Sequence, residues 1–425
     1  MVDCHDWHGD SVLSTNRGET VDCDVSIVGG GMVGGALGCA LAQQGLQVAL
    51  VEQREPDTGW SPNEVDLRVS ALTRASQRIL ENLGAWRRMS EMRISPYRGM
   101  RVWDATGSGS IQFEAAEIGE PDLGHIVENR VTQLALWEVL GEMSNVRRLC
   151  PGSVQRLELA GGRPWLELTD GRRVESRLIV AADGANSTVR ELAGIATSGW
   201  SYHQHAIVAT VLPEKHPAEI ARQRFMPTGP LAFLPINDGR CSIVWSTLPA
   251  QADILMGLDE PAFCRELEIA SQRMLGDIKS VGPRGVFPLS LRHAQRYVSE
   301  GVALVGDAAH GIHPLAGQGV NLGFLDAAVL ADVLRDAQSH GRPLGGWTTL
   351  RRYERARKGN NMEMLALMDI FKRMFGNENR PLALMRNLGL DLADASGPFK
   401  RILVRRAMGL TGELPSLAVY RPGDA

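Results

Sequence analysis

The stretch that decides the fold is Asp24-Val-Ser-Ile-Val-Gly-Gly-Gly-Met-Val-Gly34. A short apolar run with β-branched residues is followed at once by glycines, which is typical of a buried strand that enters a tight turn. Residues 32–44 have helical spacing, and a second apolar run occupies 47–51. The pattern predicts a strand, a helix and a parallel second strand, and therefore an α/β fold.

The glycines of this turn have the spacing of a dinucleotide fingerprint. Gly29 allows the tight turn, Gly31 lets the backbone approach a pyrophosphate, and Gly34 lets helix and strand pack closely. Glu52 ends the second strand, where a carboxylate can accept a hydrogen bond from a ribose hydroxyl. The alternative is a glycine-rich turn that only packs a helix. The candidate cofactor contacts of this motif are Gly29, Gly31, Met32, Val33, Gly34, Glu52 and Gln53.

A second informative segment begins far downstream, with Val302-Ala-Leu-Val-Gly-Asp-Ala-Ala-His310, and continues through Pro314-Leu-Ala-Gly-Gln-Gly-Val-Asn321. It predicts a buried strand, a turn with an acid at its tip, a small-residue loop and a helix start. Backbone N–H groups at a helix start favour an anionic ligand. Asp307 can hold sugar hydroxyls, and Pro314 can form a rigid apolar wall. The other candidates here are Gly317, Gln318, Gly319, Val320 and Asn321, with Gly317 and Gly319 leaving room for a flat ring.

Histidines flank this loop. His310 and His313 are candidates for acid–base chemistry, and of the two we assign His313 to the candidate catalytic group with Pro314, Gly317 and Gly319. For His310 we favour a turn residue that hydrogen-bonds to backbone.

Three further positions are candidate cofactor contacts. Arg68 precedes a helix predicted over 73–83, and its alternative is a solvated loop arginine. Gln133 lies near the start of a predicted helix, and its alternative is a surface residue. Asp183-Gly184 follows a buried strand, and Ser187 can cap the helix behind it. An ordinary strand–helix connection is the alternative for that segment.

Composition bounds the remaining possibilities. The chain has 425 residues, 44% hydrophobic and 22% charged, which is ordinary for a globular protein. No apolar run is long enough for a spanning helix, and the polar residues 1–21 read as a disordered tail without a signal peptide. The six cysteines are scattered and read as free thiols. We find no metal-ligand cluster and no nucleic-acid module.

Charge is unevenly distributed along the chain. Residues 351–410 contain 13 Lys and Arg against 6 Asp and Glu, whereas the whole chain has a net charge of −4. Residues from about 345 onward read as helical. Their apolar and basic segments could lie on a membrane surface, although packing on the body or on an oligomer partner is the alternative. These segments comprise Met364, Leu367, Met368, Phe371, Met374, Phe375 and the stretch 399–410.

The glycine fingerprint at 29–34, the Asp183-Gly184 segment and the Gly306-Asp307 segment together resemble the class A flavoprotein aromatic hydroxylases of p-hydroxybenzoate hydroxylase type. From about residue 22 to 410 the chain resembles the ubiquinone-biosynthesis hydroxylases of the UbiH/UbiF/VisC group. Several stretches look most like the VisC (UbiI) type, which hydroxylates a 2-polyprenylphenol: 123–129, 205–210, 241–246 and 350–358. Two others, 32–37 and 385–390, look equally like the UbiF type.

This resemblance implies a fold and a cofactor. The fold would be a Rossmann-like FAD-binding domain of glutathione-reductase type, an antiparallel-sheet substrate domain and a helical C-terminal region. The implied boundaries are 22–85, 125–200 and 290–340 for the FAD-binding domain, 86–124 and 201–289 for the substrate domain, and 341–425 for the helical region. Gly29, Gly31, Gly34 and Glu52 would hold the ADP half of FAD, Asp307 the ribityl chain, and the loop from Pro314 to Asn321 the flavin ring. Arg68 and Gln133 would contact the flavin side, and Asp183 would serve FAD and NAD(P)H.

The implied activity is hydroxylation of a polyprenylated phenol with O₂ and NAD(P)H, through a hydroperoxide on the reduced flavin. The strands at 206–211 and 231–236 could line a channel for the prenyl chain, or be plain core. Other ubiquinone-biosynthesis proteins and a second copy of the chain are candidate partners, and the expected location is the cytoplasm or the inner face of the cytoplasmic membrane. Two alternatives stay open: another FAD oxidoreductase, such as a polyprenyl reductase or halogenase, and a non-catalytic flavin-binding member of a biosynthetic complex.

Overall fold

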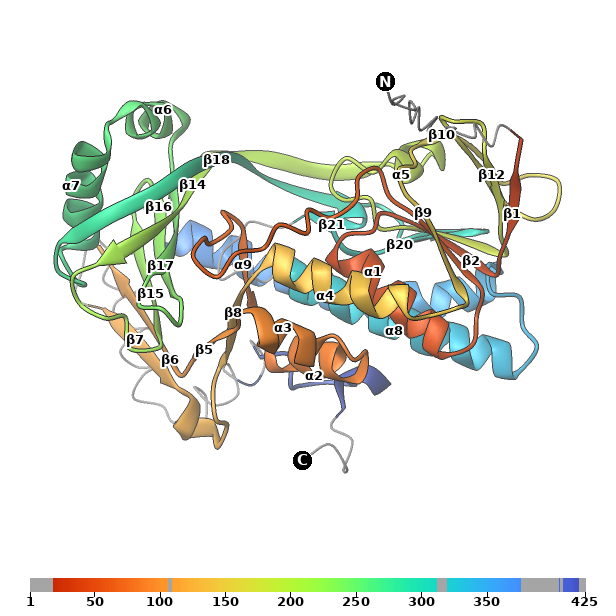
Figure 1. The fold of residues 1–425 in the computed structure, drawn as a ribbon, viewed down its shortest axis with the longest axis horizontal. Coiled ribbons are helices and arrows are strands. Elements are labelled where there is room, and N and C mark those ends of the chain that lie inside the picture. Colours follow the sequence, from red (N-terminus) through yellow and green to blue (C-terminus); the bar gives the residue numbers. More distant parts are fainter. Residues whose placement is uncertain (1–17, 106–108, 312–318, 376–404, 406–407, 420–425) are drawn as a thin grey trace, which may run out of the picture.

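The structure is a computed structural model that describes residues 18–105, 109–311, 319–375, 405 and 408–419 (Figure 1). Most of the tail predicted at 1–21 lies outside these ranges. Its last two residues do not belong to a disordered tail, because β1 (Thr20–Asp22) pairs in parallel with β12 (Arg173–Glu175). Four predicted site residues also lie outside the described residues: His313, Pro314, Gly317 and Gln318.

A mostly parallel sheet forms the first half of the molecule. Its four central strands are buried from end to end, as expected when both faces of a parallel sheet are covered. The predicted strand–helix–strand unit is confirmed, and a strand from beyond residue 300 joins the same sheet. In spatial order the sheet contains β19 (Val298–Ser299), β20 (Val302–Leu304), β13 (Leu178–Ala181), β2 (Val25–Val28), β3 (Val48–Val51) and β9 (Val146–Leu149).

Helices cover one face of this sheet, and a small sheet covers the other. The helices α1 (Met32–Gln43), α4 (Asn129–Gly141) and α8 (Gly319–Ser339) lie side by side (Figure 1). Gly35 and Gly38 of α1 let α4 approach closely, since a Cβ at Gly38 would lie 3.1 Å from Leu140. The opposite layer contains β1, β12, β11 (Trp165–Leu168) and β10 (Val154–Glu158), and its apolar residues share the same core.

A second, larger sheet forms the other half. Its long strands β14 and β18 run from this half toward the first (Figure 1). The predicted antiparallel pairing is confirmed except that β6 pairs with β15 in parallel. In spatial order it contains β21 (His310–Gly311), β18 (Ile278–Ala294), β14 (Thr197–Pro213), β17 (Cys241–Thr247), β16 (Gly229–Pro235), β15 (Ile220–Met226), β6 (Gly99–Asp104) and β7 (Ser110–Glu114).

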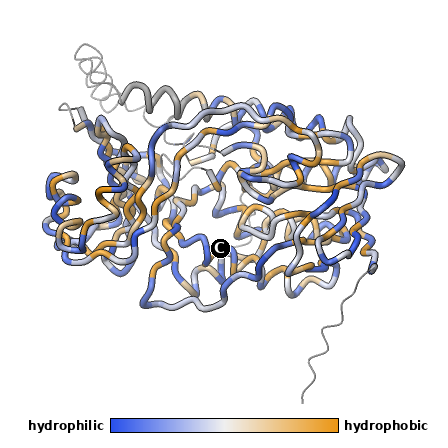
Figure 2. The backbone as a smooth tube through the Cα atoms, turned by 90° about the horizontal axis from the view of Figure 1, so that it is seen from above, coloured by the Kyte–Doolittle hydropathy of each residue, from blue (hydrophilic) through white to orange (hydrophobic). Residues whose placement is uncertain are grey.

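Alternation along these strands gives the second sheet two different faces. One face packs on α6 (Pro249–Gly257) and α7 (Glu260–Ser271) through side chains such as Ile207, Ile243 and Trp245. The residues between them point to the opposite face. Figure 2 shows hydrophobic colouring recurring along the strands in both halves.

A three-stranded sheet and two helices lie near the junction of the halves. The strands are β4 (Val69–Leu72), β8 (Gly124–Glu128) and β5 (Ser95–Tyr97), and the helices are α2 (Arg74–Asn82) and α3 (Trp86–Met92). The helix predicted over 73–83 is α2. Its N-cap is Thr73, whose side chain accepts a hydrogen bond from Ser76 N–H, and Gly84 follows its end with a positive φ of 81°.

The C-terminal part begins with α9 (Trp347–Phe375), as the sequence predicts. The stretch 376–404 lies outside the described residues, as do the side chains of Leu367, Met368, Phe371, Met374 and Phe375. The short helix η4 (Ser416–Ala418) packs against α2 and α8. Among the described residues no helix is long and apolar enough to cross a membrane.

Candidate functional site

The site is built where four neighbouring strands end. Strands β20, β13, β2 and β3 are adjacent and parallel, so their carboxyl ends lie along one edge of the sheet. The residues that follow these ends are Asp307, Asp183, Gly29 and Glu52. Three sequence motifs that are separated by more than a hundred residues therefore meet at one edge, which is where open α/β sheets bind their ligands.

The glycine turn is crowded on its protein side and open at Gly31. Gly29 has a φ of +106°, and a Cβ there would lie 2.3 Å from the carbonyl oxygen of Ala182. A Cβ at Gly34 would lie 1.9 Å from the carbonyl oxygen of Gly29. Gly31 is the N-cap of α1, has no side-chain cap and would meet nothing within 4 Å. The free N–H groups at this helix start are therefore accessible to a phosphate.

Glu52 and α4 hold the backbone of this turn at Gly30. The Gly30 N–H donates to Glu52 Oε2 at 2.6 Å, and the Gly30 carbonyl accepts from Gln133 Nε2 at 3.1 Å and Trp137 Nε1 at 2.6 Å. Gln133 thus contacts the glycine turn, and Glu52 keeps acceptor capacity for a ribose. Gln53 is exposed. Trp137 was not predicted, although it lies four residues after Gln133 and hence on the same helical face.

The Asp183 segment carries a buried acceptor without a donor. Asp183 Oδ2 accepts from Val189 N–H at 3.2 Å, whereas Oδ1 is buried and has no hydrogen-bond partner. Burial raises the pKa of Asp183. Ser187 caps α5 (Thr188–Leu192) as predicted, and Gly184 has a φ of +81° with open space around it. A ligand hydroxyl would satisfy Oδ1.

Side chains lock the motifs to one another. Arg190 donates to the carbonyl oxygens of Ala308 and Ala185, both at 3.0 Å, and so ties the Asp183 segment to the Asp307 turn. Val33, the residue after the first position of α1, packs between Gly306 and Gly323. A Cβ at Gly323 would lie 2.5 Å from Val33 Cγ2, so α8 can approach only because this position lacks a side chain.

Asp307 lies in the short turn η2 (Gly306–Ala308). Its side chain is exposed, yet burial by surrounding protein raises its pKa, while His310 and Arg68 act to lower it. The protein around Asp307 therefore disfavours its ionised form, while the side chain is accessible to a ligand.

Arg68 links this turn to the second sheet. The side chain is exposed, acts electrostatically on Asp307 and stacks 5.8 Å from the ring centroid of Phe287 on β18. Phe287 pairs across the strands with Ala206, on the face that points away from α6 and α7. This face of the second sheet is therefore the one that meets the cofactor side of the molecule.

The same face carries further unsatisfied polar atoms. Thr210 and Ser242 are cross-strand partners, and both hydroxyl oxygens are buried without a hydrogen-bond partner. Val208 and Val244 pair beside them. Small polar and apolar side chains thus alternate along β14 and β17 on the surface opposite the helices.

The start of α8 has a partly structural role. Gly319 and Val320 form its first turn. Asn321 Oδ1 accepts from Thr73 N–H at 3.0 Å and from the Ser76 hydroxyl at 2.7 Å, and Nδ2 donates to Ala71 O at 2.8 Å. The Asn321 side chain therefore fixes the β4–α2 junction. The rest of the predicted ring-binding loop lies outside the described residues.

The prediction that the His310 side chain hydrogen-bonds to backbone was wrong. The side chain does not bond to backbone: Nε2 lies 2.5 Å from Asp326 Oδ2. Nδ1 is buried and has no partner. Asp326 was not predicted as part of the site, because nothing in its local sequence indicates that α8 brings it behind the turn.

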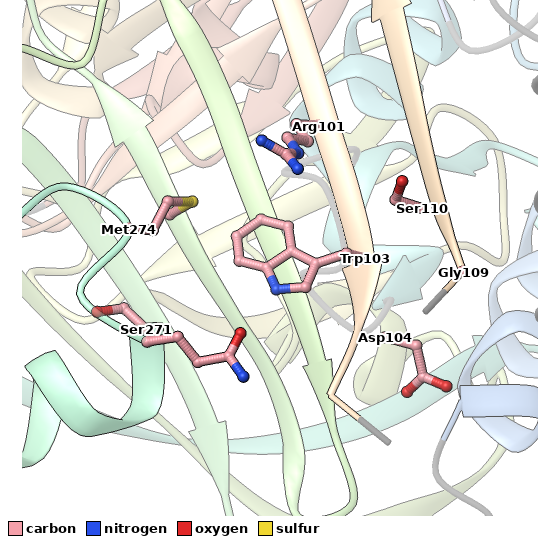
Figure 3. A pocket seen from close by; sticks show the side chains of 8 residues that line it. Arg101, Trp103, Asp104, Gly109, Ser110, Ser271 and Met274 are labelled. Atoms are coloured by element: carbon pink, nitrogen blue, oxygen red, sulfur yellow. The ribbon is translucent and has the colours of Figure 1, made fainter. Parts of the chain in front are cut away.

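A recess of about 290 Å³ lies elsewhere, at the edge of the second sheet (Figure 3). Arg101, Trp103 and Ser110 line it together with Met274, which follows α7. None of the predicted cofactor contacts borders it. Within the described ranges no cluster of His, Cys, Asp and Glu could hold a metal ion.

The residues at the strand ends fit FAD. Open backbone at Gly31 suits the pyrophosphate, and Glu52 and Asp183 offer acceptors to ribose hydroxyls. Asp307 follows β20, which is separated from β2 by β13, and so extends the same edge toward Arg68 and the second sheet. One extended dinucleotide lying along this edge would account for all four positions.

Comparisons with known proteins agree with this geometry. A family profile described as FAD binding domain matches residues 22–365. The chain is 42% identical to 3-demethoxyubiquinol 3-hydroxylase of Escherichia coli, covering 91% of this chain and 98% of that protein. It is 40% identical to ubiquinone hydroxylase UbiL of Rhodospirillum rubrum, covering 91% and 89%. The p-nitrophenol 4-monooxygenase PnpA of Pseudomonas putida has the same fold, with a TM-score of 0.75 at 18% identity over 93% of this chain and 99% of that one.

Proposed function

The chain belongs to the FAD-dependent hydroxylases of ubiquinone biosynthesis, and on that premise we propose that it hydroxylates the ring of a polyprenylated phenol with O₂ and NAD(P)H. The observation that carries the proposal is the meeting of the strand-end edge with the second sheet at Arg68 and Phe287. A cofactor along that edge would end beside a sheet face of apolar and small polar side chains.

The protein's own residues bind, orient and exclude water. Bound FAD would supply the chemistry that activates O₂, with electrons from NAD(P)H. N–H groups near Gly31 would hold the pyrophosphate, Asp183 and Glu52 ribose hydroxyls, and Asp307 the ribityl chain. N–H groups from Gly317 to Asn321 would stabilise negative charge on the reduced ring system, as we propose from the sequence.

The substrate would lie beside Phe287, on the face of the second sheet that points away from α6 and α7. Phe287 is 37% exposed although it lies within a long paired strand, so it offers an apolar surface beside Arg68. Apolar neighbours such as Val244 suit a prenyl chain, which has no polar group to satisfy.

The ring position is a separate proposal. We propose a 2-polyprenylphenol as the substrate, because the stretches quoted above resemble the VisC (UbiI) type most. Hydroxylation of a 3-demethoxyubiquinol is the second candidate. It is favoured by the 42% identity to the Escherichia coli enzyme of that name.

We also propose contact with other ubiquinone-biosynthesis proteins and, through the basic region 351–410, with the inner face of the cytoplasmic membrane. A polyprenylated substrate is dissolved in the bilayer, so an enzyme that uses it gains from peripheral binding there.

Complementation tests the activity and the ring position together. The chain is expressed in two Escherichia coli strains, one lacking the 2-polyprenylphenol hydroxylase and one lacking the 3-demethoxyubiquinol hydroxylase. Both are grown under ¹⁸O₂, and ubiquinone is measured by mass spectrometry. In the strain whose missing step the chain performs, we expect ubiquinone that carries ¹⁸O at the ring position of that step. Restored quinone without that label would refute the monooxygenase. NAD(P)H oxidation without a hydroxylated product would instead favour a reductase, and FAD binding without substrate-stimulated oxidation a non-catalytic partner.

A further inference from the structure

Asp326 of α8 is a fully buried carboxylate on which four donors converge. Its exposure is 0%. Oδ2 accepts from Gly306 N–H at 3.1 Å and from His310 Nε2 at 2.5 Å. Oδ1 accepts from Arg357 Nε at 2.7 Å and Asn361 Nδ2 at 3.1 Å, both from α9. A carboxylate has about four acceptor positions, so each of them is used.

The ionised state of Asp326 determines which nitrogen of His310 carries the hydrogen that faces it. Burial alone would raise the pKa of Asp326, but His310 and Arg357 lower it to about 2. An ionised carboxylate can only accept, so His310 must carry its proton on Nε2. Arg357 balances the charge of Asp326, and it also donates to Leu322 O and Asn361 Oδ1.

Two of the four donors bracket the cofactor turn. Gly306 and His310 stand immediately before and shortly after Asp307, and both bond to the same oxygen of Asp326. The turn that carries Asp307 is thus fixed at both ends by one carboxylate from α8. The His310 ring leaves Nδ1 buried and unpartnered, which costs free energy. Its orientation therefore serves the bond to Asp326 and not its own hydrogen-bonding capacity.

We propose that Asp326 is the positioning residue of the flavin half of the site: through Gly306 and His310 it holds the Asp307 turn in the conformation that binds FAD. Arg357 makes this possible because it neutralises a charge that could not otherwise be buried. The inference rests on the assignment of FAD to this edge, and its test reads FAD binding without reference to hydroxylation.

A general structural role is the competing explanation, and two paired variants separate the two. Asp326→Asn/Arg357→Met and Asp326→Leu/Arg357→Met both remove the ion pair, so neither leaves an unpaired buried charge. They differ in that asparagine keeps an acceptor for Gly306 N–H and leucine does not. Asp336→Asn on the same helix, a partly exposed carboxylate paired with Arg342 and Arg352, controls for loss of charge on α8.

The measurements are FAD titration of each apoprotein by flavin fluorescence, the visible spectrum of the bound flavin, and thermal unfolding. We expect the Asn/Met pair to bind FAD within about 3-fold of the parent, and the Leu/Met pair to bind at least ~10-fold more weakly, with a spectrum closer to that of free flavin. Equal FAD affinities in the two pairs, or affinities that merely follow their thermal stabilities, would overturn the proposal.

A second pair keeps the test decisive if the Leu/Met protein does not fold. His310→Gln retains a side-chain N–H that can reach Asp326, whereas His310→Ala removes it and leaves Asp326 its charge partner Arg357. We expect weaker FAD binding in His310→Ala and recovery in His310→Gln. FAD binding that is unchanged in His310→Ala would contradict the role of this bond.

Discussion

Replacing Gly31 by alanine should separate FAD binding from folding. The backbone at Gly31 has φ −68° and ψ −172°, which any residue adopts, and a Cβ there would meet no protein atom within 4 Å. An alanine N-cap costs about 0.5–1 kcal/mol relative to glycine. Reduced freedom of the unfolded chain returns about 0.4–1 kcal/mol. The two effects nearly cancel, so the free energy of unfolding of the apoprotein should hardly change.

The effect on FAD should be large. The space beside Gly31 is where the pyrophosphate would approach α1, and a methyl group there would push it away from the N–H groups. Loss of one charge-assisted hydrogen bond costs about 1.5–3 kcal/mol, which corresponds to about 10- to 150-fold in affinity. Fluorescence titration of the apoprotein measures this, with thermal unfolding of the same sample.

Two other glycines provide the controls. A Cβ at Gly34 would lie 1.9 Å from Gly29 O, so that gap must widen by about 1.4 Å to reach an ordinary carbon–oxygen contact of about 3.3 Å. Gly34→Ala should therefore lose stability and binding together, by ~3 kcal/mol or more in stability. Gly359→Ala, at an exposed position in α9, should be stabilising by about 0.5–1 kcal/mol and bind FAD normally. A Gly31→Ala protein that binds FAD within ~3-fold of the parent would refute the assignment.

Other parts of the site give predictions of their own. The pKa of Asp307 is higher in the folded protein than in the unfolded chain, so ionisation of Asp307 opposes folding. The protonated side chain therefore contributes stability at pH values below its ordinary pKa. That contribution is lost as the pH rises through the pKa of the folded protein. Asp307→Asn apoprotein should accordingly unfold at a higher temperature than the parent at pH 7 but not below pH ~4, while binding FAD more weakly; an equal difference at both pH values would contradict this. Trp137→Phe keeps an aromatic ring but removes the 2.6 Å bond to Gly30 O, and urea unfolding should show a loss of at least about 1 kcal/mol together with weaker FAD binding. Phe287→Ala should raise the KM for a prenylated phenol and leave FAD affinity unchanged, and a change in FAD affinity alone would place Phe287 at the cofactor instead of the substrate.

Much of the cofactor edge could be predicted because its chemistry is local. The strand before Gly29 and the helix that starts at Met32 are adjacent in sequence, and the close contact that needs Gly34 arises within the turn itself. The contact that needs Gly29 comes from Ala182, which follows the neighbouring strand β13. Asp183 and Asp307 each follow a buried strand directly. For such positions the order of residues already fixes which atoms point out of the sheet edge.

The positions that were missed depend on packing between distant elements. Trp137 reaches Gly30 because α4 lies against α1, and Asp326 reaches Gly306 because α8 returns behind the turn. The parallel pairing of β6 with β15 likewise joins segments more than a hundred residues apart. Periodicity identifies these helices and strands, but it does not say which side chain of one will contact which backbone group of another.

Residues at this edge of the sheet fall into two groups, according to whether their polar atoms already have hydrogen-bond partners within the protein. Asn321 and Asp326 use their side-chain oxygens on protein donors, and neither needs a cofactor to complete its bonding. Asp183 Oδ1 is buried without a donor, and Gly31 has empty space beside a helix start. Because a buried acceptor without a partner costs free energy, Asp183 Oδ1 is a candidate for a hydrogen bond from a ligand hydroxyl. We therefore propose that Gly31 and Asp183 contact the cofactor directly, whereas Asn321 and Asp326 hold the surrounding backbone in place.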